Sequence, residues 1–213
     1  MTETTLDIKE TALIVVDMQN DFCDMRGYYG LLNQPLSDLR KIIPNIQTLL
    51  ETFRRSGGTV VFTMAIYEPD GADLPHKKHR ILPGFAQRGN ALLVARNSWG
   101  SEIIEELKPE PEEYVIRKHR FSAFHNTDLE FLLRSREIKT VVITGIVTYI
   151  CVEHLARDAF IRDFDVIVVS DAVGGRDREL HENSLKSMAW SCGLVSTTEE
   201  VLRKVQFCVG AAR

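Results

Sequence analysis

Residues 140–170 read TVVITGIVTYICVEHLARDAFIRDFDVIVVS and place a helical pattern between two apolar runs. The runs Thr140–Gly145 and Val166–Ser170 are rich in β-branched residues and do not alternate with polar ones, which is typical of strands covered on both faces. Between them, the apolar residues of Ile150–Phe160 share one stripe of a helix. This stretch therefore predicts a strand, a helix and a second strand of a parallel sheet.

The same alternation extends through the rest of the chain. A helical pattern follows Pro44 and stops at Gly57, and another occupies Leu129–Leu133. Together the segments predict an α/β fold with three layers, α/β/α, around a mainly parallel, Rossmann-like sheet of about six strands. The further strand-like runs are Ala12–Val16, Thr59–Ala65, Tyr114–Ile116 and Gly193–Ser196.

We expect residues 1–213 to form a single domain, because a chain of this length buries one substantial core. The segment 67–99 is rich in proline and glycine and holds only a brief apolar run. Long irregular connections of this kind often form lids or binding loops. The segment is therefore interpreted as a lid or a subunit-interface loop, with a plain surface insertion as the alternative.

Composition excludes several classes of protein. The chain has 26 Lys and Arg against 30 Asp and Glu, so no overall basic surplus favours nucleic acid. No apolar stretch approaches the roughly 20 residues that cross a bilayer, and the start MTETTLDIKE does not resemble a signal peptide. We expect a cytoplasmic protein without a membrane partner, whose four cysteines are free thiols.

Polar residues follow three of the predicted strands. The run ALIVVD ends in Asp17, YVIRK ends in Lys118, and VVITGIVTYIC leads through a short turn to Cys151. Ligands of open parallel sheets bind beyond the carboxyl ends of the strands, so a carboxylate, an ammonium and a thiol are expected to converge there. Singly, each residue also fits a structural role: a helix-capping Asp, a solvated Lys and a buried Cys.

The three groups form a coherent chemistry. If Thr148 caps the following helix, Cys151 falls in its first turn, where free N–H groups and a nearby cation favour a thiolate. Asp17 would accept the thiol proton and later deliver it to a leaving nitrogen, while Lys118 balances charge and orients both groups. This arrangement predicts nucleophilic catalysis with no metal and no cofactor.

The segments ALIVVDMQNDF, YVIRKHRFSAFHNTDLEFLLRSREIKTVVITG and ITGIVTYICVEHLARDAFIRDFDVIVVSDAVGG resemble the isochorismatase-like cysteine hydrolases, from about residue 11 to 201. The resemblance implies a six-stranded parallel sheet and an Asp-Lys-Cys triad at Asp17, Lys118 and Cys151. It also implies a cis peptide at Ile146–Val147 and an oxyanion hole from the N–H groups of Val147 and Cys151. Phe22 and Phe121 match positions that wall the substrate pocket in relatives, although ordinary core packing explains them equally well.

Departures from other branches of that family narrow the expected activity. Nicotinamidases carry an Asp-x-His metal motif where this chain reads FTMAIYEPDG, and the pair His76 and His79 is surrounded by cations that would repel a metal. True isochorismatases lack a nucleophile at the position of Cys151. Both departures favour a metal-free amidase.

The run NSWGSEIIEELKPEPEEYVIRK and its continuation resemble the carbamoyl and ureido amidases of the family, such as N-carbamoylsarcosine amidase and ureidoacrylate amidohydrolase. Arg176 matches an arginine that binds the substrate carboxylate there, with a solvent-facing arginine as the alternative. We therefore expect an amidohydrolase that cleaves a small linear amide or ureide through a thioester and acts as a homo-oligomer, dimer or tetramer. The alternatives are another small amide such as maleamate, or a non-catalytic binding or assembly protein on the same fold.

Overall fold

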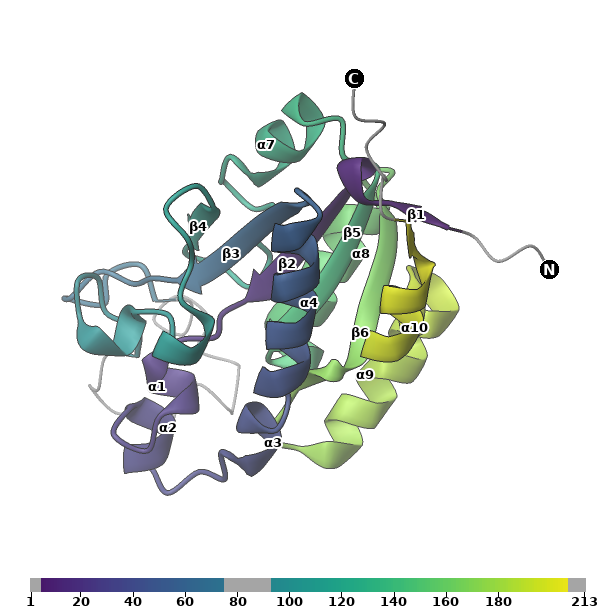
Figure 1. The fold of residues 1–213 in the computed structure, drawn as a ribbon. Coiled ribbons are helices and arrows are strands. Elements are labelled where there is room, and N and C mark those ends of the chain that lie inside the picture. The colour runs from purple at the N-terminus through teal and green to yellow at the C-terminus, as the bar shows by residue number, and fades with distance from the viewer. Residues whose placement is uncertain (1–4, 75–92, 207–213) are drawn as a thin grey trace.

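The computed structural model describes residues 5–74 and 93–206, and a six-stranded sheet forms its centre (Figure 1). All six strands are parallel, in the order β4-β3-β2-β5-β6-β7. Helices flank the sheet, which confirms the predicted α/β class with three layers. The strands are β2 (Thr11–Val16), β3 (Thr59–Ala65), β4 (Tyr114–Lys118), β5 (Thr140–Ile146), β6 (Asp165–Gly174) and β7 (Leu194–Ser196).

The central strands are buried on both faces, which explains their nearly continuous apolar sequences. In β2, Leu13 and Val15 point into one core, whereas Ala12, Ile14 and Val16 point into the other. All five side chains are 0% exposed. The apolar runs therefore mark the middle of the sheet, and the two cores hold a helical layer on each side.

Long helices cover the two faces of the sheet (Figure 1). One core contains Phe53 and Val201 from helices on the near face of Figure 1, and the other contains Leu133 and Met188 from helices behind the sheet. Full burial of a side chain such as Phe53 contributes about 1.5–3 kcal/mol to folding. The near helices are α4 (Ile43–Arg55) and α10 (Thr198–Lys204), and those behind are α7 (Leu129–Ser135), α8 (Glu153–Phe160) and α9 (Arg178–Ser191).

Shorter elements complete the described chain. A small separate sheet joins the two ends of the described chain by pairing β1 with β8. The short elements are β1 (Leu6–Asp7), β8 (Val205–Gln206), α1 (Asn20–Cys23), α2 (Tyr28–Leu31), α3 (Ser37–Arg40), η1 (Ile8–Glu10), η2 (Trp99–Ser101) and η3 (Glu105–Leu107). Of these, α1 and η2 lie beyond the carboxyl ends of β2 and β3, where the Gln19 side chain donates to the carbonyls of Ala65 and Ser101.

The structure differs from the sequence-based expectations at several boundaries. Strand β4 continues two residues beyond the expected end and includes Lys118. The helix expected from Ile150 begins at Glu153, and a π-helical turn, η4 (Thr148–Val152), precedes it. Helix α9 was not expected, because it buries only Ser184 and Met188 and its sequence therefore shows little apolar periodicity.

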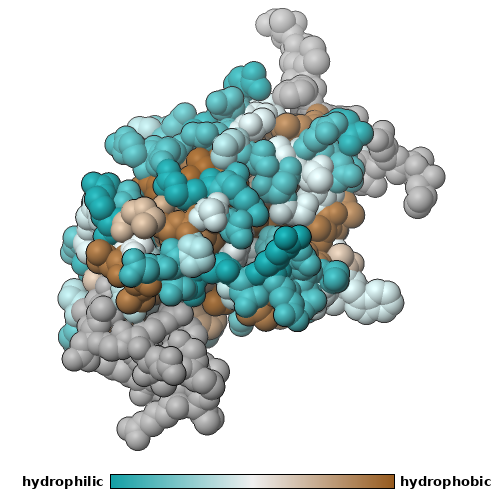
Figure 2. All heavy atoms as spheres, turned by 90° about the horizontal axis from the view of Figure 1, so that it is seen from below, coloured by the Kyte–Doolittle hydropathy of each residue, from teal (hydrophilic) through white to brown (hydrophobic). Residues whose placement is uncertain are grey.

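The segment 67–99, predicted as a lid or interface loop, lies largely outside the described residues. Its described ends approach each other, because Tyr67 forms an isolated parallel bridge with Ala95. None of the described helices is long and apolar enough to span a membrane. From below, the molecular surface is mainly hydrophilic, with hydrophobic side chains in scattered groups (Figure 2).

Candidate active site

Asp17 and Lys118 stand at the carboxyl ends of two strands of the sheet. Asp17 follows β2 with φ +51°, a left-handed conformation that Asp tolerates better than most residues. Its backbone N–H donates to the carbonyl of Thr63 in β3 at 3.2 Å. Lys118 is the last residue of β4, in register with Ala65 at the end of β3. The two side chains therefore approach from opposite sides of β3.

Cys151 lies in η4, the π-helical turn between β5 and α8. The peptide bond between Ile146 and Val147 is cis, at the position that the family resemblance implied. Thr148 does not cap the helix as expected, since Val147 is the residue before the turn and no side chain caps it. The Val147 carbonyl instead accepts the N–H groups of Ile150 at 2.9 Å and Val152 at 3.3 Å, which closes the turn that presents Cys151.

Gly145 brings the end of β5 against β2. Its φ is +101°, and a Cβ atom built at this position would lie 2.2 Å from the carbonyl oxygen of Val16. Any side chain would force the two strands apart. A glycine is therefore required immediately beside Asp17, just before the turn that carries the cysteine.

The side chains of Asp17, Lys118 and Cys151 meet at this edge of the sheet. The Lys118 ammonium lies 2.7 Å from Oδ2 of Asp17 and 3.3 Å from Sγ of Cys151. It also donates to the carbonyl of Arg120 at 3.2 Å, while Oδ1 of Asp17 accepts the Thr63 hydroxyl at 2.7 Å. The exposed fractions of the Lys118 and Asp17 side chains are 1% and 2%. The convergence expected from the strand ends is present, and the catalytic roles of the three groups remain a prediction.

The thiol is held in its protonated form by its surroundings. Burial raises the pKa of Cys151 to about 12, with a further increase from the charge and hydrogen bond of Asp17, although the Lys118 charge opposes the shift. This result differs from the expected thiolate, because desolvation outweighs the nearby cation. The resting site therefore contains a neutral thiol beside a carboxylate and an ammonium, and the nucleophile forms only when a proton leaves Sγ.

Lys118 stays charged although it is buried. Burial opposes its charge, but Asp17 and Cys151 more than compensate and raise the pKa of Lys118 above its ordinary value. Burial likewise raises the pKa of Tyr67 to about 12, with further effects from Cys151, Lys118 and Asp17. The site thus contains a neutral phenol that sequence reasoning missed, although Tyr67 follows the end of β3 and a census of all strand ends would have included it.

Two of the predicted substrate-binding residues share one neighbour, Tyr29. Phe22 is 8% exposed, and its ring centroid lies 5.2 Å from that of Tyr29. The Arg176 guanidinium stacks on the other side of this cluster, 4.1 Å from the Tyr29 ring centroid, and donates to Gln34 at 2.6 Å. Its Nε is buried and makes no hydrogen bond with the described part of the chain. Arg176 is half-buried with its guanidinium turned toward the buried Tyr29 ring, and its role in binding substrate stays a prediction.

Phe121 lies apart from that cluster. It is half-buried, and its ring meets the edge of the His154 imidazole with a centroid distance of 5.3 Å. His154 in turn contacts the carbonyl of Ile150 at 2.7 Å, so Phe121 is linked to the turn that carries Cys151. Its role in binding substrate, like the oxyanion hole assigned to the N–H groups of Val147 and Cys151, stays a prediction.

The two histidines considered for a metal site, His76 and His79, lie outside the described residues. Within 5–74 and 93–206, no group of three His, Cys, Asp or Glu side chains is arranged to hold a metal ion.

Comparison with known proteins gives one family match. Residues 11–200 match the model described as the isochorismatase domain. Similar solved structures include a cysteine hydrolase from Pseudomonas syringae pv. phaseolicola 1448A, with 31% identity and a TM-score of 0.81 over 96% of this chain and 98% of that chain. N-carbamoylsarcosine amidase from Thermoplasma acidophilum is 32% identical, with a TM-score of 0.69 over 89% of this chain and 97% of that chain.

A third similar structure is the nicotinamidase/pyrazinamidase from Bacillus subtilis, with 29% identity and a TM-score of 0.74. The alignment covers 88% of this chain and 99% of that chain. The printed names describe a cysteine hydrolase and two amidases, and the two amidase names imply different amides on a shared fold.

Proposed function

This chain belongs to the isochorismatase family of hydrolases, and from that premise we propose that it is a cysteine amidohydrolase acting on a small linear amide or ureide. The observation that carries the proposal is the position of the Lys118 ammonium, 2.7 Å from a carboxylate oxygen and 3.3 Å from a thiol. An ion pair between Asp17 and Lys118 that served only to stabilise the fold would not need a thiol in contact with the ammonium. Asp17, Lys118 and Cys151 together supply a base, a fixed positive charge and a nucleophile.

The reaction begins with a proton transfer. Asp17 accepts the proton of the Cys151 thiol, since both side chains contact the Lys118 ammonium and the charge of Asp17 already acts on the thiol. Sγ then attacks the carbonyl carbon of the substrate, and the C–N bond breaks as Asp17 returns the proton to the departing nitrogen. Ammonia or an amine leaves, and the acyl group remains on Sγ as a thioester. Water next attacks the thioester while Asp17 accepts a proton from it, and the thiol is regenerated by that proton.

Lys118 makes the first step possible in a buried site. The thiolate that forms on Cys151 would be costly in an apolar environment, as its raised pKa of about 12 indicates. The ammonium is fixed at 3.3 Å before the charge develops, so it stabilises the thiolate without reorganisation. The thiol is thus neutral at rest, and the ammonium that stabilises the thiolate is already in place when the proton leaves.

We propose that the substrate carries a carboxylate and belongs to the carbamoyl or ureido acids. Arg176 supports this class, because its guanidinium is drawn inward against Tyr29 and its buried Nε lacks a partner in the described residues. A guanidinium in this state gains most from a carboxylate, which accepts two parallel hydrogen bonds. The structural similarity to a protein named N-carbamoylsarcosine amidase agrees with the same class.

A panel of small amides tests the proposed activity. The purified protein is incubated with carbamoyl amino acids, ureido acids, maleamate and simple aliphatic amides, and ammonia release is measured with and without a chelator. We expect turnover of a carbamoyl or ureido acid that persists after chelation. Binding without ammonia release from any member of the panel would instead favour the non-catalytic alternative.

The role of Arg176 is tested by substitution. Arg176→Ala should lower kcat/KM for a carboxylate-bearing substrate by about 10- to 100-fold, because a hydrogen-bonded charge pair is lost. The neutral ester or amide of the same substrate should lose much less. Arg178→Ala is the matched control, since the Arg178 side chain is 87% exposed and paired with Glu182. Equal wild-type rates on the acid and its neutral analogue would contradict the assignment and favour a small uncharged amide.

A further inference from the structure

We propose that His181 is a positioning residue for Cys151, acting through Thr148. This inference rests on the proposed function, since it concerns the turn that presents the nucleophile. His181 is in α9, an element that sequence reasoning did not identify, and no part of the proposed mechanism uses it. Its contact with Thr148 is the route by which it acts.

Thr148 is the first residue of the turn that carries Cys151. It follows Val147, which forms the cis peptide, and its side chain is 0% exposed. The Thr148 hydroxyl is not used as a helix cap and lies 2.8 Å from Nδ1 of His181. A buried hydroxyl that loses its partner is costly, so this bond fixes the orientation of Thr148 and with it the start of the turn.

Helix α9 contacts the turn at a second position, one helical turn after His181. The Ser184 hydroxyl donates to Oε2 of Glu153, the first residue of α8, at 2.7 Å and lies 3.4 Å from the Thr148 carbonyl. Asp177 caps the first turn of α9 by accepting the N–H of Leu180 at 2.9 Å. The start of α9 is therefore fixed locally, and it holds both ends of the segment that contains Cys151.

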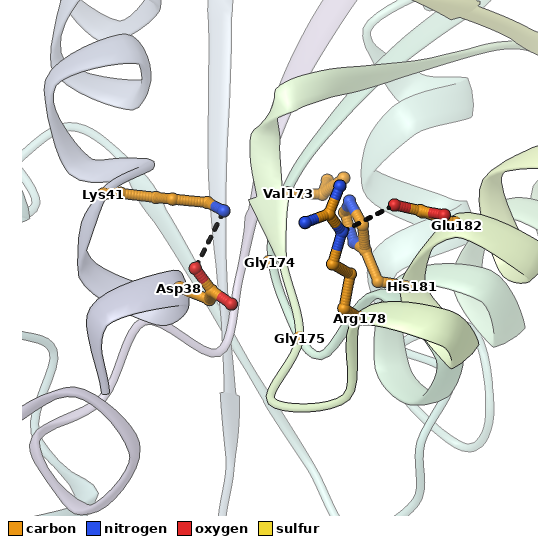
Figure 3. Close-up of a pocket in the computed structure, with 8 residues that line it drawn as sticks. All are labelled: Asp38, Lys41, Val173, Gly174, Gly175, Arg178, His181 and Glu182. Carbon is orange, nitrogen blue, oxygen red and sulfur yellow. Dashed lines mark hydrogen bonds and ion pairs between the residues drawn. The ribbon is translucent and has the colours of Figure 1, made fainter. Parts of the chain in front are cut away.

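The other side of His181 faces an open cavity. Figure 3 shows this pocket between α3 and α9, with Lys41 and Asp38 on one wall and Arg178, His181 and Glu182 on the other. The cavity has a volume of about 340 Å³ and includes Gly174 and Gly175 at the end of β6. His181 therefore contacts the buried Thr148 on one side and lines the open cavity on the other.

Burial, more than the surrounding charges, favours the neutral form of His181. Burial lowers the pKa of His181, and Lys41 lowers it further, while Glu182 and Asp38 act in the opposite direction. A neutral imidazole offers either a donor or an acceptor at Nδ1, so it is able to pair with a hydroxyl in both orientations. The ring therefore forms a stable partner for Thr148 near neutral pH, and its role is to orient the turn without touching the substrate.

Three variants test the contact. His181→Leu and Thr148→Val each remove one partner, and His181→Asn keeps a hydrogen-bonding atom near the position of Nδ1. We expect each of the first two to lower kcat about tenfold with little change in KM, because one hydrogen bond is lost. The double variant should be no slower than either single variant, since both remove the same interaction. His181→Asn should recover most of the rate.

Alkylation of Cys151 by iodoacetamide gives a second measurement that needs no substrate. Its rate is followed against pH, with the modified peptide identified by mass spectrometry. We expect the midpoint of this profile to shift in His181→Leu and Thr148→Val and to return in His181→Asn, because the environment of Sγ depends on where the turn places it. His125→Leu is the control, since His125 is exposed and its ring contacts the neighbouring Asn126.

The two measurements separate the positioning role from the proposed function. If no amide is hydrolysed by the wild-type protein but the alkylation profile shifts as expected, the proposed function fails and the positioning role stands. If thermal stability falls in His181→Leu while the alkylation profile and kcat stay unchanged, the residue is merely structural and the inference is wrong. Multiplicative losses in the double variant would also overturn it.

Discussion

Two groups of ion pairs lie at the same edge of the sheet, and they differ mainly in burial. Lys118 and Asp17 are 2.7 Å apart with exposed fractions of 1% and 2%. Lys41 and Asp38, in the open pocket of Figure 3, are 2.9 Å apart with exposed fractions of 64% and 45%. The distances are nearly equal. Distance alone therefore does not distinguish a candidate active site from a solvated ion pair.

The two ion pairs are expected to contribute differently to stability because water reaches only one of them. An exposed pair contributes about 0–1 kcal/mol, because water screens both charges. A buried pair interacts strongly, and removal of one partner leaves an uncompensated charge that costs about 3–5 kcal/mol. The buried pair also contacts a thiol, whereas the described part of the open pocket contains no cysteine. Burial and the contact with Cys151 therefore distinguish the candidate active site from the open pocket.

The largest expected effect is the loss of the nucleophile. Cys151→Ala should reduce ammonia release below detection while the fold is retained, because the thiol that lies beside Lys118 and forms the thioester is lost. Circular dichroism and thermal unfolding verify the fold, and Cys192→Ala is the matched control at a cysteine far along the chain. Turnover at the wild-type rate in Cys151→Ala would exclude covalent thiol catalysis.

The second-largest effect is expected at Asp17, where loss of the proton acceptor and a lower pKa of Cys151 are measured separately. Asp17→Asn should lower kcat by about three to four orders of magnitude, because the proton acceptor is lost. The charge and hydrogen bond of Asp17 raise the pKa of Cys151, so the same variant should shift alkylation of the thiol to lower pH. In the wild-type protein, alkylation should keep increasing as the pH rises from 9 toward about 12, where the thiol titrates. Loss of turnover with easier thiolate formation is the signature of a missing base.

Substitution of Lys118 tests the buried pair directly. Lys118→Met fills a similar volume but leaves the Asp17 carboxylate without its cation, and the free energy of unfolding should fall by about 3–5 kcal/mol. Turnover should also fall, because Lys118 opposes the rise in the Cys151 pKa. Chemical denaturation gives the stability change. If Lys118→Met unfolds at the same denaturant concentration as the wild-type protein, the buried pair contributes no more to stability than an exposed one.

The smallest effect is expected in the open pocket. Lys41→Ala should change stability by less than about 1 kcal/mol, because its pair with Asp38 is exposed. Turnover should remain close to wild type. A loss comparable to that of Lys118→Met would remove the contrast between the two regions and show that the pocket takes part in the reaction.

Most of the sheet was predictable because its strands are buried on both faces. Strand β2 is apolar at every position after Thr11, and its partners β3 and β5 are apolar apart from their threonines and one glycine. Asp17, Lys118 and Cys151 were predictable because parallel strands place their carboxyl ends at one edge. The parallel arrangement of the strands was therefore enough to predict that the three side chains lie close together.

Other features depend on three-dimensional surroundings that sequence patterns do not encode. Helix α9 buries few apolar side chains, and its contact with Thr148 joins residues 33 positions apart. The protonation state of Cys151 was expected incorrectly, because the sequence shows a nearby cation but not the depth of burial that outweighs it. The inward position of Arg176 depends on Tyr29 and Gln34, which lie far from it in sequence.

Direct observation of the acyl-enzyme is the most direct test of the account. A substrate found in the amide panel is mixed with the protein, the reaction is quenched during turnover, and the mass of the peptide that contains Cys151 is measured. If Cys151 is the nucleophile, this peptide gains the mass of the acyl group, hydroxylamine removes that mass, and Cys151→Ala shows no such gain. Continued turnover without an adduct on Cys151, together with full activity of Cys151→Ala, would contradict it.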